Sequence, residues 1–460
     1  MMEKMSKFSK STSFSPTTSF TRSTSFNRSQ SLKSRTLSVT TPTSCQSSWV
    51  SWVSLFSWVS RWFNTLIVTG IFISFLIALY GGYLYVMPSL SLTFHGYGVL
   101  KHANLISSCD VFDGSWVFDD NYPLYNATEC PFVEQGFNCL ANGRRDKHYL
   151  KYSWKPNNCD IPRFDVPSIL EKLRGKRVVF VGDSMSRTQW ESLICLLMTG
   201  VEDKKSVYEV NGNKITKQIR YLSVHFSSFN FTIEFFRSVF LVQHGWLPRH
   251  APKRVKSILK LDKLDDISNQ WINSDILIFN TGQWWVPEKL FDLGCYFQFG
   301  NSLKLGMSIP TAFRTALDTW ASWVEEKIDT NRTRVFFRTF EPSHWSDPTR
   351  RFCNVTLHPM VDTRNRDKSI FSDTVHEVVK NMTINVAVLH VTSMSSFRSD
   401  AHVGNWSDKP SFPDCSHWCL PGLPDVWNEI ILFYLPYDSK GILVSISIGF
   451  FTLFHTCFLT

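Results

Sequence analysis

Val178-Val-Phe-Val-Gly-Asp-Ser184 is a hydrophobic run that ends in Gly-Asp-Ser, and the residues directly after it, Met185 to Leu197, have helical periodicity. This pattern predicts a strand, a tight turn and a helix. Such a turn would place Ser184 at the C-terminal edge of a sheet and at the N-terminus of a helix, where free N–H groups and the helix dipole favour developing negative charge. A nucleophilic serine would be useful there. For the tripeptide by itself, the alternative is a structural turn with an N-capping serine.

Beyond this stretch, short β-branched or aromatic runs alternate with segments of helical periodicity. The runs are Arg177–Val181, Ile276–Thr281, Arg334–Phe340 and Val386–Met394, and the helical segments are Ser186–Thr199, Pro310–Ile328, Lys368–Met382 and Leu423–Leu435. Repeated alternation of strand and helix predicts an α/β domain with a mostly parallel sheet flanked by helices. Leu222–Leu241 instead has the pattern of two adjacent strands, which predicts a hairpin at one edge of the sheet.

A serine nucleophile needs a general base and a group that orients the base. Asp414-Cys-Ser-His417 supplies both, because a spacing of three residues lets the Asp414 carboxylate reach Nδ1 of His417 and leaves Nε2 to face Ser184. The chain order Ser, Asp, His is one of several that give this geometry. We therefore predict Ser184 as nucleophile, His417 as base and Asp414 as the residue that orients the base.

Other interpretations of these residues stay open at this point. Asp414 and His417 could form only a local structural hydrogen bond. Cys415, His417 and Cys419 resemble a metal cluster, but no second ligand pair has suitable spacing, so we expect no metal. Asp400-Ala-His402 is a rival carboxylate–base pair.

Acyl chemistry also requires hydrogen-bond donors for an oxyanion. Asn280-Thr-Gly282 ends the run Ile276–Thr281, so it would bring an amide side chain and a glycine N–H to the same sheet edge as Ser184. We predict that Asn280 and the backbone N–H groups of Ser184 and Gly282 stabilise the oxyanion, beside Gly182 of the turn. Turn capping is the alternative role for Asn280.

The N-terminal part of the chain predicts a membrane anchor. Leu66–Met87 holds 22 residues and no charge, enough to cross a bilayer core of about 30 Å. Eight Lys or Arg residues and one acid, Glu3, lie within residues 1–61. The positive-inside rule therefore predicts a type II orientation, with residues 1–61 in the cytosol and residues 88 onward in a lumen.

Two features agree with a lumenal body. Six glycosylation sequons follow the predicted span, at Asn126, Asn230, Asn331, Asn354, Asn381 and Asn405. Nine of the eleven cysteines lie in the body, between the predicted span and the apolar tail, namely Cys109, Cys130, Cys139, Cys159, Cys195, Cys295, Cys353, Cys415 and Cys419. An oxidising lumen would convert most of these cysteines into bridges, and since nine is odd, at least one stays unpaired within the chain.

The charge distribution excludes one class of partner. The whole chain has 48 basic and 39 acidic side chains, so 40 basic and 38 acidic ones remain after residue 61. A body this close to neutral has no basic face that argues for nucleic acid. It also argues weakly against strong attraction to polygalacturonate.

The sequence thus predicts six segments. These are a disordered Ser/Thr-rich basic tail at 1–61, a transmembrane helix at 66–87, a stem at 88–108, a Cys-rich and loop-rich lobe at 109–165, a catalytic α/β domain at 166–437, and an apolar tail at 441–460. For the last segment a second span, a helix packed on the body and a remnant of an alternative gene model all stay open.

From about Cys109 to Leu435 the chain resembles the plant trichome birefringence-like family. The motifs that carry the resemblance are Cys109-Asp-Val-Phe-Asp-Gly-Ser-Trp116, Tyr122-Pro-Leu-Tyr125, Cys130-Pro-Phe, Trp154-Lys-Pro, Gly182-Asp-Ser-Met-Ser-Arg187, Gln189-Trp-Glu-Ser192, Phe279-Asn-Thr-Gly282 and Asp414-Cys-Ser-His-Trp-Cys-Leu-Pro421. Two departures are Gln283, where many relatives have a histidine after Asn-Thr-Gly, and the apolar tail.

The resemblance implies a fold similar to that of SGNH/GDSL hydrolases, with Ser184, His417 and Asp414 as the triad. It implies the bridges Cys109–Cys159, Cys130–Cys195, Cys139–Cys419 and Cys353–Cys415, which leave Cys295 free. It also implies a Golgi membrane protein that moves an acetyl group through an acetyl-serine onto hydroxyls of a plant cell wall polysaccharide, namely xylan, xyloglucan, mannan or pectin.

For this activity the resemblance implies no bound cofactor. Acetyl-CoA is the assumed donor, and membrane proteins that supply the donor are candidate partners. Two alternatives remain: a polysaccharide acetyl esterase, and a non-catalytic protein that bridges pectin and other wall polysaccharides through exposed aromatic residues such as Trp284 and Trp285.

Overall fold

The computed structural model describes residues 66–80 and 109–435, apart from 247–249, 348, 364 and 410. The chain divides into two units, Met1–Tyr85 and Val86–Thr460. In the first unit residues 66–80 form a helix. Within the described ranges, no helix combines the length and the apolar character that a membrane crossing requires. Residues 81–87 of the predicted span, the tail at 1–61, the stem at 88–108 and the apolar tail at 441–460 lie outside the described residues, so the membrane anchor stays a prediction.

The second unit is built on a seven-stranded sheet with the order β13-β12-β9-β3-β6-β5-β4. The strands are β13 (Val386–Leu389), β12 (Arg334–Arg338), β9 (Ile276–Asn280), β3 (Arg177–Gly182), β6 (Phe231–Arg237), β5 (Tyr221–Phe226) and β4 (Val207–Glu209). The first five strands run parallel to one another, whereas β5 is antiparallel to both of its neighbours, β6 and β4. This arrangement confirms the predicted mostly parallel sheet.

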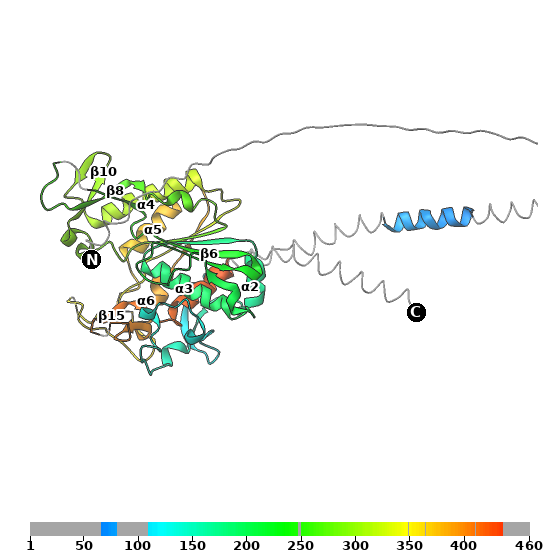
Figure 1. The fold of residues 1–460 in the computed structure, drawn as a ribbon, viewed down its shortest axis with the longest axis horizontal. Helices are drawn as coiled ribbons and strands as arrows, with labels where there is room; N and C mark the ends of the chain where they lie inside the picture. The colour runs from blue at the N-terminus through cyan, green and yellow to red at the C-terminus, as the bar shows by residue number, and fades with distance from the viewer. Residues whose placement is uncertain are drawn as a thin grey trace, which may run out of the picture. The chain divides into compact units, whose positions relative to one another are not determined.

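Helices cover both faces of this sheet, as Figure 1 shows for α3 and α2 on one side and α4 and α5 on the other. The helices are α2 (Val166–Leu173), α3 (Ser184–Met198), α4 (Ile309–Lys327), α5 (Ile370–Lys380), α6 (Val391–Ser396) and α7 (Leu423–Phe433). Along β3, Val178 and Phe180 pack with α3 and α7, whereas Val179 and Val181 pack with α4. Burial on both faces explains why these strands read as continuous hydrophobic runs.

Two predicted elements differ from the structure. The run Val386–Met394 is a strand only as far as Leu389, and the chain then turns at His390 into α6. Val391 and Met394, three residues apart, both face the core from that helix, so a helical period lies within the apolar run. The Leu222–Leu241 hairpin exists as β5 and β6, but β6 pairs with β3, and the three-residue β4 forms the edge.

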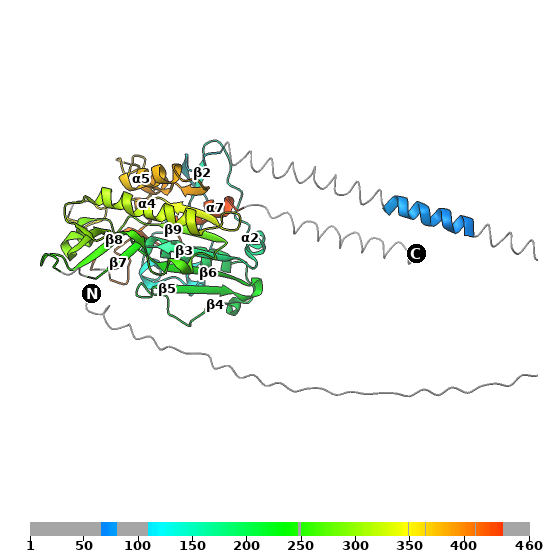
Figure 2. The same cartoon turned by 90° about the horizontal axis from the view of Figure 1, so that it is seen from above.

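A second sheet follows β6, and the sequence did not predict it. Its order is β11-β10-β8-β7, with β7 (Val242–Gly245), β8 (Ser257–Leu264), β10 (Cys295–Phe299) and β11 (Ser302–Lys304). Leu259, Leu261 and Phe297 face the core that α4 shares with the main sheet. Figure 2 shows β7 and β8 at one end of this unit and β6 and β4 toward the other.

The lobe before α2 is rich in loops, as predicted, with several 3-10 helices and one antiparallel pair, β1 (Gly114–Phe118) and β2 (Tyr152–Pro156). All four predicted bridges are present: Cys109–Cys159, Cys130–Cys195, Cys139–Cys419 and Cys353–Cys415. Cys295 is free and buried. Because two of the bridges join the lobe to α3 and to the segment before α7, the lobe is covalently fixed to the α/β domain.

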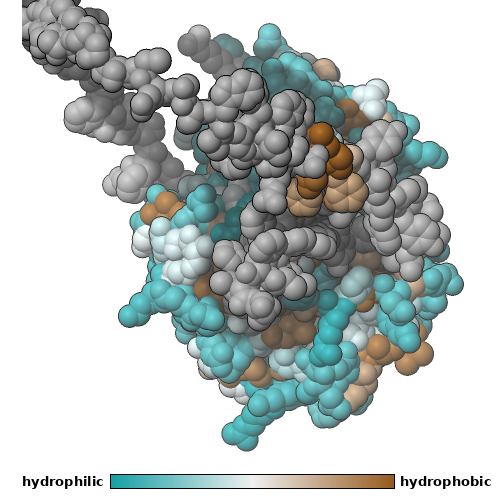
Figure 3. All heavy atoms as spheres, turned by 90° about the vertical axis from the view of Figure 1, so that its right-hand side faces the viewer, coloured by the Kyte–Doolittle hydropathy of each residue, from teal (hydrophilic) through white to brown (hydrophobic). Residues whose placement is uncertain are grey.

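Large hydrophobic side chains are concentrated in two buried clusters, one on each face of the main sheet. On the face of the molecule in Figure 3, the outline is mostly hydrophilic (teal) and hydrophobic residues (brown) are scattered between hydrophilic ones.

Candidate active site

The turn between β3 and α3 holds Ser184 at the first position of the helix. Asp183 is the N-cap, and its Oδ1 accepts a hydrogen bond from the Met185 N–H at 2.9 Å. Because Asp183 caps the helix, the Ser184 hydroxyl is not needed as a cap, and the interpretation of Ser184 as a structural N-cap is wrong. A Cβ on Gly182 would lie 2.6 Å from Ser186 Oγ and would overlap the Asn280 side-chain oxygen. Glycine is therefore required before the turn.

The structure brings the three predicted triad residues together from segments 230 residues apart. Asp414 and His417 lie on β15 (Asp414–Trp418), which pairs with β14 (His402–Gly404). His417 Nε2 lies 2.7 Å from Ser184 Oγ, and His417 Nδ1 lies 2.7 Å from Asp414 Oδ2. The other oxygen of Asp414 accepts the backbone N–H of His417 at 2.9 Å and that of Ser416 at 3.1 Å. The carboxylate is thus fixed on both sides, and Nδ1 of His417 has an acceptor for its proton.

The electrostatics suit a general base. Burial by itself would lower the pKa of His417, but the charge and the hydrogen bond of Asp414 reverse this effect, so the net shift is upward. Burial would raise the pKa of Asp414, but its contacts with His417 and the two backbone N–H groups hold that pKa far below its ordinary value. Asp414 therefore stays ionised and stabilises the imidazolium that would form when His417 takes a proton.

The predicted oxyanion residues lie beside the turn. Asn280 ends β9, is almost fully buried, and its side-chain oxygen accepts the Ser186 hydroxyl at 2.8 Å and the Asp183 N–H at 3.3 Å. This oxygen holds the turn, as the capping alternative proposed, and only the NH2 group of the side chain is left to donate. The Ser184 N–H is the first of α3 and has no acceptor within the helix. Gly282 lies two residues beyond β9, with a φ of +154°, and a Cβ added there would lie 2.8 Å from the Phe340 ring.

Two residues that sequence reasoning missed support the base. Phe137 of the lobe stacks on His417, with ring centroids 5.3 Å apart and an interplanar angle of 29°. The Arg187 guanidinium lies 5.0 Å from the Phe137 ring and pairs with Glu134 and with Glu191, the latter at 3.1 Å. The ring therefore lies between the base and a buried cation. No local pattern around Phe137 distinguishes it from the other aromatics of a loop-rich segment.

The rival pair Asp400/His402 does not face Ser184. Asp400 pairs with Arg398 at 2.9 Å, whereas His402 lies 2.7 Å from Nδ1 of His344 and 3.0 Å from the His417 backbone oxygen. Burial lowers the pKa of His344 to about 4 and that of His402 well below its ordinary value. His344 and His402 are therefore neutral at physiological pH, and their hydrogen bonds hold β15 in place.

The contacts of Cys415, Cys419, Trp285 and Gln283 bear on the other interpretations of these segments. Cys415 and Cys419 are both disulfide-bonded, so the metal-cluster interpretation of this segment is wrong. Trp285 is buried and packs edge-on against Phe313, so it is no stacking platform for a glycan. Gln283, which differs from the histidine of many relatives, donates from Nε2 to the Glu341 backbone oxygen at 2.7 Å.

The glycosylation sequons lie on the surface of the second unit. Asn126, Asn230, Asn331, Asn381 and Asn405 are exposed, and Asn354 is partly exposed. Each is accessible to a glycosyltransferase, and glycosylation itself stays a prediction.

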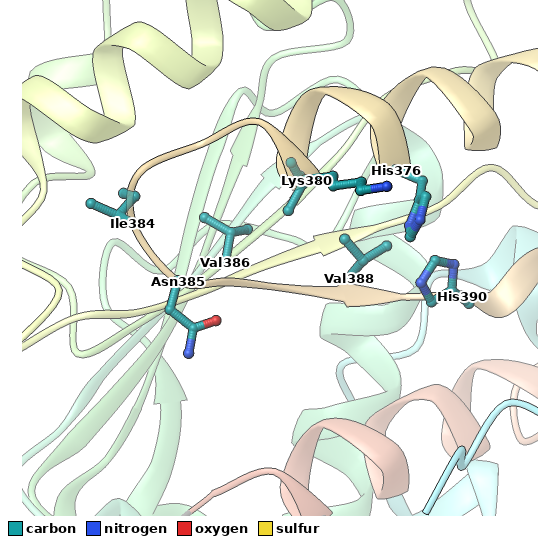
Figure 4. A pocket seen from close by; sticks show the side chains of 8 residues that line it. His376, Lys380, Ile384, Asn385, Val386, Val388 and His390 are labelled. Atoms are coloured by element: carbon teal, nitrogen blue, oxygen red, sulfur yellow. The ribbon is translucent and has the colours of Figure 1, made fainter. Parts of the chain in front are cut away.

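A pocket lies apart from the triad, between α5 and the edge strand β13 (Figure 4). His376 and Lys380 line it from the helix, and Asn385, Val388 and His390 line it from the strand and its ends. Since β13 is separated from β3 by β12 and β9, this pocket does not contain the nucleophile.

Comparison with known proteins agrees with this geometry. Residues 161–434 match the model of the GDSL/SGNH-like acyl-esterase family found in Pmr5 and Cas1p, and residues 107–160 match the Pmr5 N-terminal domain. The chain is 68% identical over 381 residues to the Arabidopsis thaliana protein trichome berefringence-like 7, covering 82% of this chain and 85% of that protein.

Two further Arabidopsis relatives are less similar. Trichome birefringence-like 6 is 40% identical over 73% of this chain and 72% of its own length, and trichome birefringence-like 9 is 38% identical over 77% and 90%. The chain belongs to the trichome birefringence-like family, and its α/β domain is a GDSL/SGNH-like acyl-esterase domain.

Proposed function

We propose that this protein is an O-acetyltransferase that moves an acetyl group through an acetyl-Ser184 intermediate onto hydroxyls of a plant cell wall polysaccharide. The observation that carries the proposal is the chain of contacts from Ser184 Oγ to His417 Nε2 and from His417 Nδ1 to Asp414. That arrangement lies in an acyl-esterase domain whose relatives are trichome birefringence-like proteins.

In the first half-reaction, Ser184 Oγ attacks the acetyl carbonyl of the donor while its proton moves to His417 Nε2. The Ser184 N–H and the Asn280 NH2 group support the tetrahedral oxyanion. His417 then returns its proton to the leaving group as the bond to the donor breaks. The products of this step are acetyl-Ser184 and the free donor thiol or alcohol.

In the second half-reaction, His417 takes the proton of a sugar hydroxyl, and the resulting oxygen nucleophile attacks the acetyl-serine carbonyl. Collapse of the second tetrahedral intermediate breaks the bond to Ser184 Oγ, which recovers the proton from His417. Asp414 stabilises the imidazolium in both halves. Acetyl-CoA is the donor that we propose.

We further propose that the second unit works in the Golgi lumen, behind an N-terminal type II anchor. The uncharged run Leu66–Met87, the basic residues before it and the six sequons after it support this location. The four disulfide bonds also fit an oxidising compartment.

The test is acetyl transfer by the full chain to defined xylan, xyloglucan, mannan and pectin oligosaccharides, followed by mass spectrometry. We expect one glycan to gain an acetyl group with the wild type and with Ser228→Ala, a control on an exposed serine. We expect no transfer with Ser184→Ala. A folded Ser184→Ala protein that still transfers acetyl groups would refute the proposal.

An esterase uses the same residues and differs only in whether water or a sugar attacks acetyl-Ser184. The description of the matching family as acyl-esterases favours this second candidate. The same assay separates the two, because an esterase would release acetate from acetylated glycans and leave unacetylated ones unchanged. A bridging protein without catalysis would instead bind glycans equally well with His417→Ala and show no turnover.

A further inference from the structure

Arg237 is a cation beside the nucleophile that has no ion-pair partner among the residues that the structure describes. It is the last residue of β6 and lies opposite Gly182 in the sheet register. The Ser238 N–H donates to the Gly182 oxygen at 2.8 Å, which ties the end of β6 to the turn before Ser184. The guanidinium is partly buried and lies 5.6 Å from the centre of the Trp284 ring.

The contrast with a neighbouring arginine shows that this lack of a partner is unusual. Arg220, whose backbone oxygen accepts the Arg237 N–H, pairs with both Asp265 and Asp266, at 2.5 and 2.7 Å. Arg237 is the more buried of the two, yet no carboxylate of the described residues lies within ion-pair distance of it. The charge of the buried Asp183 favours the Arg237 cation, but burial outweighs this effect and lowers the pKa of Arg237. A partly buried cation without a carboxylate costs stability unless something else neutralises it. A ligand anion next to Ser184 would do so.

The cationic and aromatic side chains continue away from the nucleophile. Lys289 is exposed, and its ammonium lies 5.0 Å from the centre of the same Trp284 ring. Phe291, two residues after Lys289, packs against the Tyr296 ring of β10 with ring centroids 5.4 Å apart. The Arg254 guanidinium lies 5.5 Å from the same Tyr296 ring. We call Arg237, Trp284, Lys289, Tyr296 and Arg254 the cationic strip. Its cations alternate with aromatic rings that are partly exposed.

The charge of the segment that includes β7 and β8 also favours an anionic ligand. Residues 243–263, which include β7 and β8, hold six basic side chains and one acidic one. The six are Arg249, Lys253, Arg254, Lys256, Lys260 and Lys263, and the acid is Asp262. The near-neutral count over the whole body therefore conceals a basic segment, which begins six residues after Arg237 and ends just before Asp265 and Asp266.

We propose that the cationic strip binds the carboxylates of uronic acid residues in the acceptor polysaccharide. This assignment rests on the proposed function, since it concerns the acceptor of the same site. A guanidinium forms two parallel hydrogen bonds with a carboxylate, and an aromatic ring packs against the C–H face of a sugar. A polymer with a carboxylate and a C–H face in successive residues matches a strip in which cations and rings alternate, whereas a neutral glycan would leave Arg237 unpaired.

The direct test measures binding in the Ser184→Ala background, where no acetyl transfer intervenes. The full chain is titrated with an oligogalacturonide, with a glucuronoxylan oligosaccharide, and with the methyl ester of each. We expect the free acid of at least one pair to bind about tenfold more tightly than its ester. Adding Arg237→Gln should abolish this preference, Arg237→Lys should keep part of it, and Arg254→Gln should weaken it. Arg314→Gln, which changes an exposed side chain of α4, is the control and should leave the preference unchanged.

Several outcomes would overturn the inference. Equal affinity of the Ser184→Ala protein for the free acids and for their methyl esters would do so. A preference for the free acid that survives Arg237→Gln would also do so. Loss of affinity for acetyl-CoA in Arg237→Gln, with acceptor binding unchanged, would show that the anion is a phosphate of the donor. If Arg237→Gln fails to fold, the Arg237→Lys and Arg254→Gln proteins still decide, because both must reduce the preference.

The proposed function and this inference can fail separately. Hydrolysis of p-nitrophenyl acetate by the full chain, compared with Ser184→Ala, reports on Ser184 without any acceptor, so it tests the proposed function independently of the binding titrations. Absence of all Ser184-dependent chemistry, combined with Arg237-dependent binding of the free acid, would reject the transferase and keep the uronate site.

Discussion

Replacement of Asp414 by asparagine tests how far His417 depends on its carboxylate. The change removes the charge 2.7 Å from His417 Nδ1 but preserves an oxygen that can accept the backbone N–H groups of Ser416 and His417. The local backbone should therefore survive. What is lost is the stabilisation of the imidazolium that forms in each half-reaction.

The magnitude follows from Coulomb's law. With charge centres about 4 Å apart and an effective dielectric constant of about 20, the attraction is about 4 kcal/mol. At about 1.4 kcal/mol for each factor of ten, this corresponds to a loss of about 1,000-fold in kcat. An asparagine that turns its NH2 group toward Nδ1 would also favour the wrong tautomer and enlarge the loss.

The assay is Ser184-dependent hydrolysis of p-nitrophenyl acetate by the full chain, with acetyl transfer to the best glycan as a second readout. Asp408→Asn, an exposed aspartate between β14 and β15, is the matched control and should retain wild-type activity. Thermal unfolding of each protein verifies the fold. A folded Asp414→Asn protein with more than a tenth of wild-type kcat would refute the assigned role of Asp414.

Three further predictions follow from the same contacts. Activity requires neutral His417, whose pKa is raised above the ordinary 6.5. The pH–rate profile should therefore fall as the pH is lowered through a midpoint above 6.5, and Asp414→Asn should move that midpoint to lower pH. An unmoved midpoint would contradict the role assigned to Asp414. Phe137→Leu keeps an apolar side chain but removes the ring that stacks on His417. We expect kcat to drop by about tenfold, and the smaller side chain to cost about 1–3 kcal/mol in the free energy of unfolding. Unchanged kcat would show that the stack is only packing. Gly182→Ala places a methyl group 2.6 Å from Ser186 Oγ. We expect denaturant titration to show a loss of about 1–3 kcal/mol in the free energy of unfolding, and activity to fall by a larger fraction. A Gly182→Ala protein with wild-type stability and wild-type activity would argue against the described turn.

The main sheet and the triad could be predicted because each depends on short-range patterns. The strand β3 is a continuous apolar run that ends at a turn, and Asp414 and His417 are three residues apart, close enough for one side chain to reach the other. The alternation of runs and helical segments then gives the layer arrangement. Family resemblance supplied the pairing of the cysteines, which spacing leaves undetermined.

The parts that escaped prediction depend on contacts across long separations. Phe137 meets His417 only because the Cys139–Cys419 bridge joins segments 280 residues apart. Arg237 lies opposite Gly182, at the turn before Ser184, because β6 is the neighbour of β3, whereas the sequence predicts the hairpin at an edge. The strand β15 has its partner in the three-residue β14, which no alternating pattern reveals.

The central claim is that Ser184 carries the acetyl group between donor and acceptor. The most direct measurement is peptide mass spectrometry of the full chain after brief incubation with an acetyl donor and acid quenching, without any glycan. The account predicts a mass gain of one acetyl group on the peptide that contains Ser184, absent in Ser184→Ala and lost from the wild type when the acceptor glycan is added. Acetyl transfer to glycan with no acetylated Ser184 peptide under any quench, or an acetyl group on another residue that turns over at the same rate, would contradict it.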